Sequence, residues 1–174
     1  MRYLVDRGNA RDKTALTFPP TEGHAMSSAV HVEESVQIDR PPAEVWDAIA
    51  NYAFDLEWRN GLKEMQPDPD GPPAPGTKVH EVVRNSGRDY VADTVVTDLD
   101  PGVSYRFAGG GTIGGLAGGR SVQADEVGTG AVFTYTIDLK PKGAMRLMPF
   151  LGPIVRSGLK KDLTRLKGLL DNRG

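Results

Sequence analysis

The sequence predicts an α+β domain in which a curved antiparallel sheet of about six to seven strands wraps around a long C-terminal helix. Segments with alternating apolar residues follow one another from residue 77 to residue 139, and the short turns between them are typical of antiparallel hairpins. Near the C-terminus, Leu159, Leu163, Leu166 and Leu170 recur at helical spacing. With 174 residues, the chain is long enough for one domain with a substantial core.

The domain is expected over residues 30–172, after a flexible N-terminal tail over residues 1–29. The tail carries charges, prolines and serines and has no sustained helix or strand period. Met26 is either the true start of the protein or the mark of an appended leader, and the sequence leaves both open. Apolar residues alternate along a first strand over residues 32–38. Glu34 interrupts this pattern, so it lies either in water near a strand end or at a site.

Two short helices should follow the first strand. Pro41 and Pro42 suit the first turn of a helix, where a backbone N–H has no helical partner in any case. An apolar stripe follows at helical spacing, made of Val45, Trp46, Ile49 and Ala53. A second helical piece is expected over Phe54–Trp58. Asn60–Gly61 and residues 67–76, with five prolines, are expected to be turns and loops.

Five further strands are expected, at Thr77–Asn85, Asp89–Leu99, Val103–Ala108, Arg120–Val127 and Ala131–Leu139. In the last strand, Phe133 and Tyr135 belong to the inward face, and Tyr105 and Phe107 form a similar inward row. In the strand over residues 77–85, alternation favours an outward His80, because that register buries two valines and hides only one carboxylate.

Glycines dominate residues 109–119, between two of the expected strands. Gly109, Gly111 and Gly114 have the spacing of a dinucleotide-binding loop, but the glycines that follow disfavour the helix that such a site requires. A mobile hairpin loop is therefore expected here.

The last element is expected to be a helix from Ala144 to about Asp171. Its first half is apolar nearly all round and contains Pro149 and Pro153, which interrupt helical hydrogen bonding. A kink or a broken first turn is expected there.

Composition excludes several kinds of site. The chain has no Cys, which rules out disulfides and thiolate chemistry. Its three histidines have no metal-binding spacing, and no metal or cofactor is expected. The formal net charge of -2 gives no general attraction to nucleic acid. No apolar run is long enough to span a membrane, and the N-terminus lacks a signal-peptide core, so a cytoplasmic protein is expected.

The order of these elements resembles the helix-grip fold of the START/Bet v 1-like (SRPBCC) superfamily, and within it the polyketide cyclase/dehydratase-like proteins of bacteria. The resemblance covers roughly residues 30–172 and rests on residues 38–46 (IDRPPAEVW), Gly76-Thr77, Leu99-Asp100-Pro101 and the terminal segment 163–170. These are structural signatures, so they specify the fold better than the function. The resemblance implies a cavity that binds lipids, sterols, polyketides or other apolar molecules, with the glycine-rich loop and its Ile113 and Leu116 as a gate.

The leading hypothesis is a protein that binds a small hydrophobic or aromatic ligand, lipid- or polyketide-like, with cyclase or dehydratase activity left open. The expected ligand-binding residues are Trp58, Tyr90, Tyr105, Phe107, Phe133, Tyr135, Met148 and Leu151. No catalytic residue is assigned. The titratable candidates for an acid or base are Glu34, His80, Tyr90, Asp93, Asp125 and Tyr135.

Two alternatives belong to other functional classes. Residues 142–174 hold eight Lys and Arg against two Asp, a local charge of +6. These charges either form the solvated back of the helix or contact a membrane, with Met145, Leu147, Met148 and Phe150 entering the interface of a docked lipid carrier. The other alternative is a protein-interaction module without enzymatic activity. No nucleic-acid partner is expected, and both a monomer and a homodimer stay open.

Overall fold

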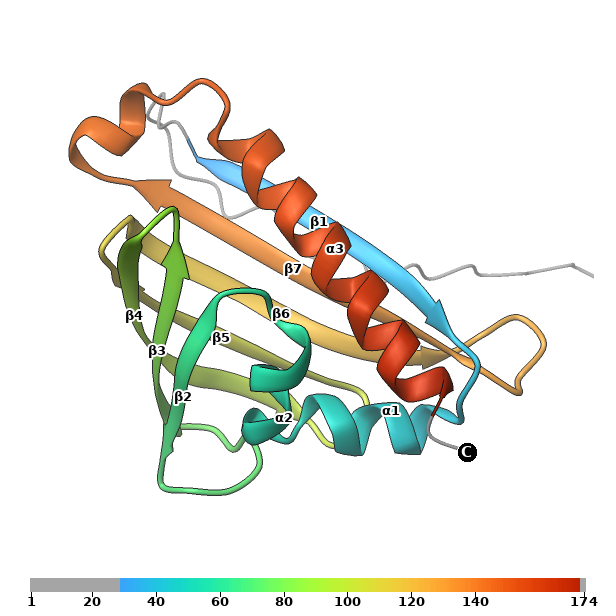
Figure 1. Cartoon of the computed structure of the whole chain (residues 1–174). Helices are drawn as coiled ribbons and strands as arrows, with labels where there is room; N and C mark the ends of the chain where they lie inside the picture. The colour runs from blue at the N-terminus through green and yellow to red at the C-terminus, as the bar shows by residue number, and fades with distance from the viewer. Residues whose placement is uncertain (1–28, 173–174) are drawn as a thin grey trace, which may run out of the picture.

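The sheet curves around one long helix, as Figure 1 shows for the computed structural model, which describes residues 29–172. The strands are β1 (Val30–Ile38), β2 (Leu62–Asp68), β3 (Lys78–Asn85), β4 (Arg88–Asp100), β5 (Ser104–Gly111), β6 (Gly114–Ala124) and β7 (Ala131–Pro141). The helices are α1 (Pro42–Ile49), α2 (Tyr52–Trp58), the 3-10 helix η1 (Gly143–Leu147) and α3 (Leu151–Asp171). The seven strands run β1-β7-β6-β5-β4-β3-β2, all antiparallel, which confirms the helix-grip fold. The flexible tail expected over residues 1–29 lies, apart from residue 29, outside the described residues.

The two short helices lie where the sequence places them. Pro42 opens α1, which buries Val45, Ala48 and Ile49. The α2 helix begins two residues earlier than expected, because the Asn51 side chain accepts a hydrogen bond from the Ala53 N–H at 3.1 Å and caps its first turn.

Strand β2 was not expected from the sequence, and its last two residues, Pro67 and Asp68, fall in the segment assigned to a loop. Only Leu62 of this strand is buried, so its alternation is weak. Pro67 is tolerated because β2 lies at the edge of the sheet, where a missing N–H removes no interior hydrogen bond. The strand pairs with β3, with Leu62 opposite Val83 and Met65 opposite Glu81.

The glycine-rich segment is strand, and the expectation of a mobile hairpin loop is wrong. Strands β5 and β6 extend to Gly111 and from Gly114, so the turn between them has only two residues. Gly118 lies opposite Phe107, and a Cβ on Gly118 would come within 2.8 Å of the Phe107 ring. Glycine here leaves room for an aromatic side chain to lie over the neighbouring strand.

The C-terminal helix breaks where its prolines predicted. Instead of one helix from Ala144, the short η1 is followed by α3, and Pro149 lies between them. Pro153 does not interrupt α3, because it lies in the first turn, where the backbone N–H has no helical partner.

Contacts at both ends hold α3 against the sheet. Leu159, Leu163, Leu166 and Leu170 are all at most 5% exposed and form the core with the sheet and α1. At the C-terminal end, the Arg40 Nε donates to the Leu170 carbonyl at 3.0 Å. Glu34 lies in the middle of β1, half-buried, and pairs with Arg156 at 3.3 Å and Lys160 at 3.8 Å. Glu34 therefore ties β1 to α3.

Candidate functional site

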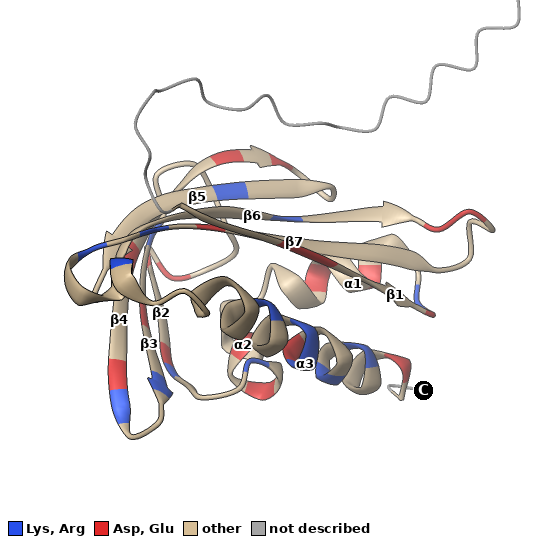
Figure 2. Cartoon of the chain, turned by 90° about the horizontal axis from the view of Figure 1, so that it is seen from above, with Lys and Arg blue, Asp and Glu red and all other residues tan. Residues whose placement is uncertain are grey.

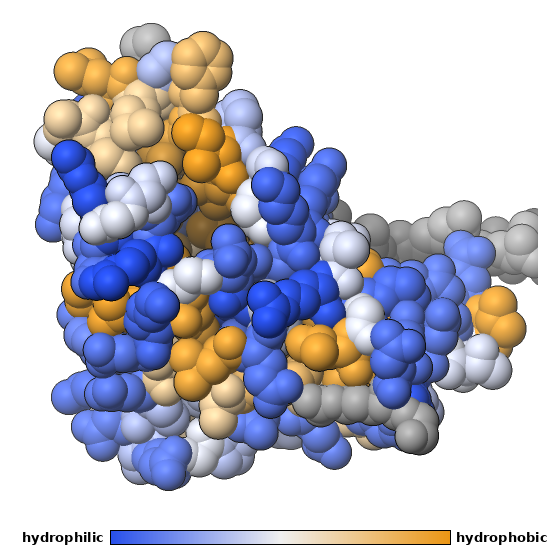
Figure 3. All heavy atoms as spheres, in the orientation of Figure 1, coloured by the Kyte–Doolittle hydropathy of each residue, from blue (hydrophilic) through white to orange (hydrophobic). Residues whose placement is uncertain are grey.

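A cavity of about 680 Å³ lies between the concave face of the sheet and the first half of α3. Its wall is mostly apolar and aromatic, from alternate residues of β3 to β7, with Met145 of η1 and Leu151 and Val155 of α3 as its cover. A volume of this size suits a small organic ligand. In Figure 3, an apolar surface leads into a hollow beside α3.

Six of the eight predicted ligand-binding residues line this cavity: Tyr90, Tyr105, Phe107, Tyr135, Met148 and Leu151. The other two, Trp58 and Phe133, are 0% exposed and do not line it. Phe133 faces the concave side of the sheet, as alternation predicted, but it packs against Trp58 of α2 with ring centroids 6.3 Å apart. The cavity begins beyond them.

The concave side therefore has two parts, which are defined by their residues. The solid half contains Val122, Phe133 and Trp58 together with the second half of α3. The hollow half contains Leu116, Ile137 and Leu139 together with the first half of α3. Cross-strand pairing keeps each half together, since Val122 lies opposite Phe133 and Leu116 lies opposite Leu139.

A buried ion pair lies between the two halves. Arg120, opposite Tyr135 in the sheet, is 2% exposed and holds the fully buried Asp55 with two hydrogen bonds, the longer at 2.9 Å. Its guanidinium lies 4.7 Å from the Tyr135 ring centroid and 5.3 Å from that of Trp58. Trp58 also donates to Asp55, at 3.1 Å. Both Arg120 and Tyr135 reach the cavity wall.

A second pair extends this network across the cavity wall. Arg59, just after α2, holds Glu81 of β3 with two hydrogen bonds of 2.7 Å and lies 3.7 Å from Asp55. Burial alone would raise the pKa of Glu81, but the Arg59 charge and hydrogen bonds lower it below its ordinary value. Burial alone would lower the pKa of Arg59 and of Arg120. The carboxylates of Glu81 and Asp55 outweigh burial and raise the pKa of both guanidinium groups above the ordinary value. The network consists of two full ion pairs.

Tyrosine hydroxyls complete the polar end of the cavity. Burial raises the pKa of Tyr52 to about 12 and, together with Asp55, holds that of Tyr105 well above its usual value. Both side chains are therefore protonated donors at neutral pH. Tyr52 and Arg120 both line the cavity. The Arg120 Nε is buried and makes no hydrogen bond, and the buried Tyr52 hydroxyl lies close enough to Tyr105 for that side chain to lower the Tyr52 pKa against the larger effect of burial. Hydroxyl and guanidinium groups are donors, for which a ligand oxygen is a suitable acceptor.

Of the six titratable candidates, Tyr90 and Tyr135 line the cavity, whereas Glu34, His80, Asp93 and Asp125 do not. His80 faces outward, as predicted, and its Nδ1 lies 2.7 Å from an Asp93 carboxylate oxygen. Asp125 accepts hydrogen bonds from the backbone of Gly128 and Thr129 in the β6–β7 turn. Among residues 29–172, no group of three or more metal-binding side chains is placed to hold a metal ion.

The sequence did not single out Arg120, Asp55 or Arg59. Arg120 lies two residues before the buried Val122, so strand alternation was a signal that could have placed it inward. Asp55 and Arg59 have the spacing of neighbours on a helix face. Glu81 did appear in the sequence analysis, because it is the one carboxylate that lies on the inward face of its strand when His80 faces outward.

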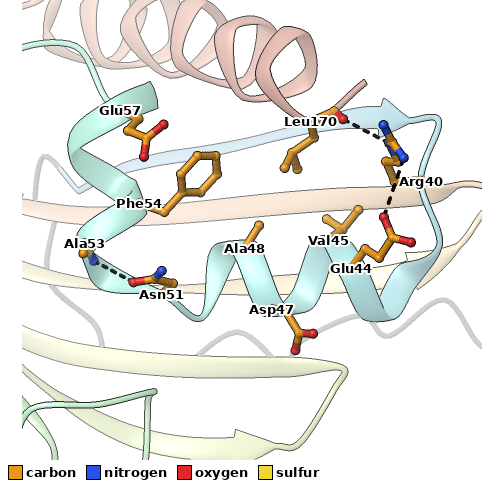
Figure 4. A pocket seen from close by; sticks show the side chains of 10 residues that line it. All are labelled: Arg40, Glu44, Val45, Asp47, Ala48, Asn51, Ala53, Phe54, Glu57 and Leu170. Atoms are coloured by element: carbon orange, nitrogen blue, oxygen red, sulfur yellow. Dashed lines mark hydrogen bonds and ion pairs between the residues drawn. The ribbon is translucent and has the colours of Figure 1, made fainter. Parts of the chain in front are cut away.

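A smaller hollow of about 440 Å³ lies on the outside of the domain, between α1, α2 and the end of α3 (Figure 4). Arg40 at its edge donates to Leu170 and lies 3.9 Å from Glu44. Arg40 therefore holds the C-terminal end of α3 in place. None of the predicted ligand-binding residues lines this smaller hollow.

No helix within the described part of the chain is long and apolar enough to cross a membrane. No curated protein matches the sequence. A family model described as polyketide cyclase / dehydrase and lipid transport matches residues 29–171.

Several solved structures resemble the domain. The Zhui aromatase/cyclase from a Streptomyces species has a TM-score of 0.69 at 18% identity, over 83% of this chain and 95% of that one. Ara h 8.0201 has a TM-score of 0.62 at 15% identity, over 82% and 97%. The di-domain ARO/CYC protein StfQ of the steffimycin pathway has a TM-score of 0.66 at 11% identity, over 83% and 51%. At these identities the likeness concerns the fold alone.

Proposed function

Since the chain belongs to the polyketide cyclase / dehydrase and lipid transport family of the START/Bet v 1-like superfamily, we propose that it binds a small hydrophobic or aromatic molecule, lipid- or polyketide-like, between its sheet and α3. The observation that carries this proposal is the hollow half, a mostly apolar cavity with Arg120 and the Arg59–Glu81 pair in its wall. Such a combination of apolar wall and few convergent polar groups is typical of ligand sites.

The ligand is expected to lie with its apolar body against Phe107, Met148 and Leu151 and with an oxygen atom toward Tyr52 and Arg120. Tyr52 and Arg120 bring donor groups to this end of the cavity, so an oxygen-bearing ligand is favoured over a pure hydrocarbon. Tyr90, Tyr105 and Tyr135 supply the remaining aromatic contacts.

Cyclase or dehydratase chemistry would depend mainly on how the cavity folds such a ligand. Holding two reacting carbons of one chain in contact can contribute up to about 7–11 kcal/mol in favourable systems. The protonated hydroxyls of Tyr52 and Tyr105 are suited to donate to a ligand carbonyl, whereas both carboxylates of the network are held by arginines.

A cavity-filling variant tests the proposal. Ala92 of β4 lines the cavity, and Ala92→Trp is expected to fill part of it and weaken binding of a fluorescent aromatic probe, 1-anilinonaphthalene-8-sulfonate, by more than about tenfold. Val95 lies on the opposite face of the same strand, so Val95→Trp is the matched control and should bind the probe like the wild type. Equal probe binding by wild type, Ala92→Trp and Val95→Trp would rule out the cavity as the site.

Native mass spectrometry of the protein from its own host, followed by extraction of any adduct, would then identify the chemical class of the ligand. An apolar, oxygen-bearing adduct that is present in Val95→Trp and absent from Ala92→Trp is the expected result.

A further inference from the structure

Exposed apolar side chains gather at one end of the domain. Among residues 29–172, seven large hydrophobic residues are exposed, and four of them lie within eight residues of one another: Leu147 (83%), Met148 (42%), Phe150 (69%) and Ile154 (49%). These four residues, at the end of η1 and the start of α3, are here called the apolar tip. Figure 3 shows the apolar surface that gathers at this end of the molecule. Water-exposed apolar side chains in such number at one place mark an interaction surface.

Cations surround the apolar tip. Residues 139–161 contain six Lys and Arg and no Asp or Glu, in a chain whose formal net charge is -2. Arg156 and Lys160 pair with Glu34, but Lys140, Lys142 and Arg146 are exposed, and within the described residues none of the three has an ion pair. Figure 2 shows that Lys and Arg, in blue, recur along α3. The partner of this surface is therefore expected to be negatively charged.

The apolar tip also borders the mouth of the cavity. Met148 and Ile154 are partly exposed and at the same time line the cavity, and Met145 of η1 lines it beside them. A surface that covers the tip therefore also covers the entrance to the hollow half.

We propose that the apolar tip inserts into the surface of an anionic lipid bilayer, with Lys140, Lys142 and Arg146 against the headgroups. A bilayer fits these observations better than a folded protein, because the apolar side chains project from a turn rather than form a groove, and the cations flank them as they do in interfacial segments. The proposal goes beyond ligand binding, since it assigns the place at which an apolar ligand passes between cavity and membrane without crossing water.

Vesicle sedimentation with the full chain tests this docking surface. The wild type should sediment with vesicles of phosphatidylcholine and phosphatidylglycerol, bind vesicles of phosphatidylcholine alone at least about tenfold more weakly, and lose binding as salt rises. The Leu147→Ser/Phe150→Ser variant and the Lys142→Gln/Arg146→Gln variant should each reduce binding by at least about tenfold. Val127 is 80% exposed in the β6–β7 turn, away from the tip, so Val127→Ser is the matched control and should bind like the wild type.

Tryptophan emission reports insertion directly. Phe150→Trp should shift its emission to shorter wavelength on anionic vesicles, whereas Val127→Trp should show no shift. The Ala92→Trp variant should still sediment with vesicles, which separates failure of docking from failure of ligand binding.

Sedimentation that is equal with neutral and anionic vesicles would overturn the proposal. A second result would also overturn it: the wild type is a dimer, and Leu147→Ser/Phe150→Ser is a monomer that binds vesicles as the wild type does. The tip would then be a contact between two copies of the chain.

Discussion

The two halves of α3 face the same sheet with different results. From Leu163 onward, the inward leucines are at most 5% exposed and belong to the same core as Phe133 and Trp58, and Leu159 lies at the boundary, because it belongs to this core and also lines the cavity. Before Leu159, the inward residues Leu151 and Val155 face the cavity instead. The same alternation in the strands and the same helical spacing therefore produce a packed core at one end and a hollow at the other.

The difference shows what keeps a cavity open in a small domain. An apolar void is unfavourable because its walls lose contacts, so the sheet and helix would be expected to close on it. At the boundary, Arg120 joins β6 to Asp55 of α2, and Arg59 joins the end of α2 to Glu81 of β3. These groups cannot collapse into the hollow half without losing their partners. The network is thus placed to act as the floor of the cavity.

The boundary gives the largest expected effect. Arg120→Met leaves Asp55 buried without its main partner, and the free energy of unfolding should fall by about 3–5 kcal/mol, measured by urea denaturation. The double variant Arg120→Met/Asp55→Leu removes both charges and should recover more than half of this loss. Arg84 pairs with Asp89 on the surface, so Arg84→Met is the matched control and should unfold like the wild type. A double variant no more stable than Arg120→Met would show that the pair does not behave as a unit.

Leucines in the two halves of α3 provide a smaller, internally matched comparison. Leu163→Ala opens a new void in the solid half and should lower the free energy of unfolding by about 3 kcal/mol. Leu151→Ala, although Leu151 is only 6% exposed, should lower it by about 1 kcal/mol, because that side chain already borders empty space. Equal losses in the two variants, measured by urea denaturation, would contradict the division of the domain into a solid and a hollow half.

The sequence predicted most of the fold, because strand alternation and helical spacing are local patterns. The exceptions have local causes. Strand β2 buries one residue and contains Pro67, so its pattern is that of a loop. The glycines of β5 and β6 leave residues 109–119 with little apolar alternation, so the strands there give little sequence signal. The break at Pro149 was predictable because a proline acts on its own helix.

For the site, the sequence predicted which face of each strand points inward, but not which inward residues line the cavity. Alternation assigns Phe133 and Tyr135 to the same side of β7, but it does not say which of them lies opposite the packed half of the helix. Asp55 and Arg120 are 65 residues apart in the chain, and only the fold brings them together. Ion pairs of this kind leave no periodic signal in a sequence.

The smallest expected effect concerns pH and Glu81. Because Arg59 lowers the pKa of Glu81 in the folded protein, the unfolded chain binds more protons than the folded protein in acid. The stabilisation from this pair is therefore complete above the ordinary carboxyl pKa of 4.5 and is lost as the pH falls from there through the lowered pKa. Glu81→Gln should be less stable than the wild type at pH 7, and the difference between the two proteins should shrink in acid.

Urea denaturation of both proteins at a series of pH values measures this difference, whose slope cannot exceed about 1.4 kcal/mol per pH unit for one proton. Asp89→Asn is the matched control, because the Asp89 pKa is also lowered by an arginine but the pair lies in water, where solvent screens it. Its difference from the wild type should therefore change much less with pH. A difference in free energy of unfolding between Glu81→Gln and the wild type that stays constant from neutral to acid pH would contradict this prediction. In that case the charge on Glu81 would not contribute to stability, and the pair would act only through its two hydrogen bonds.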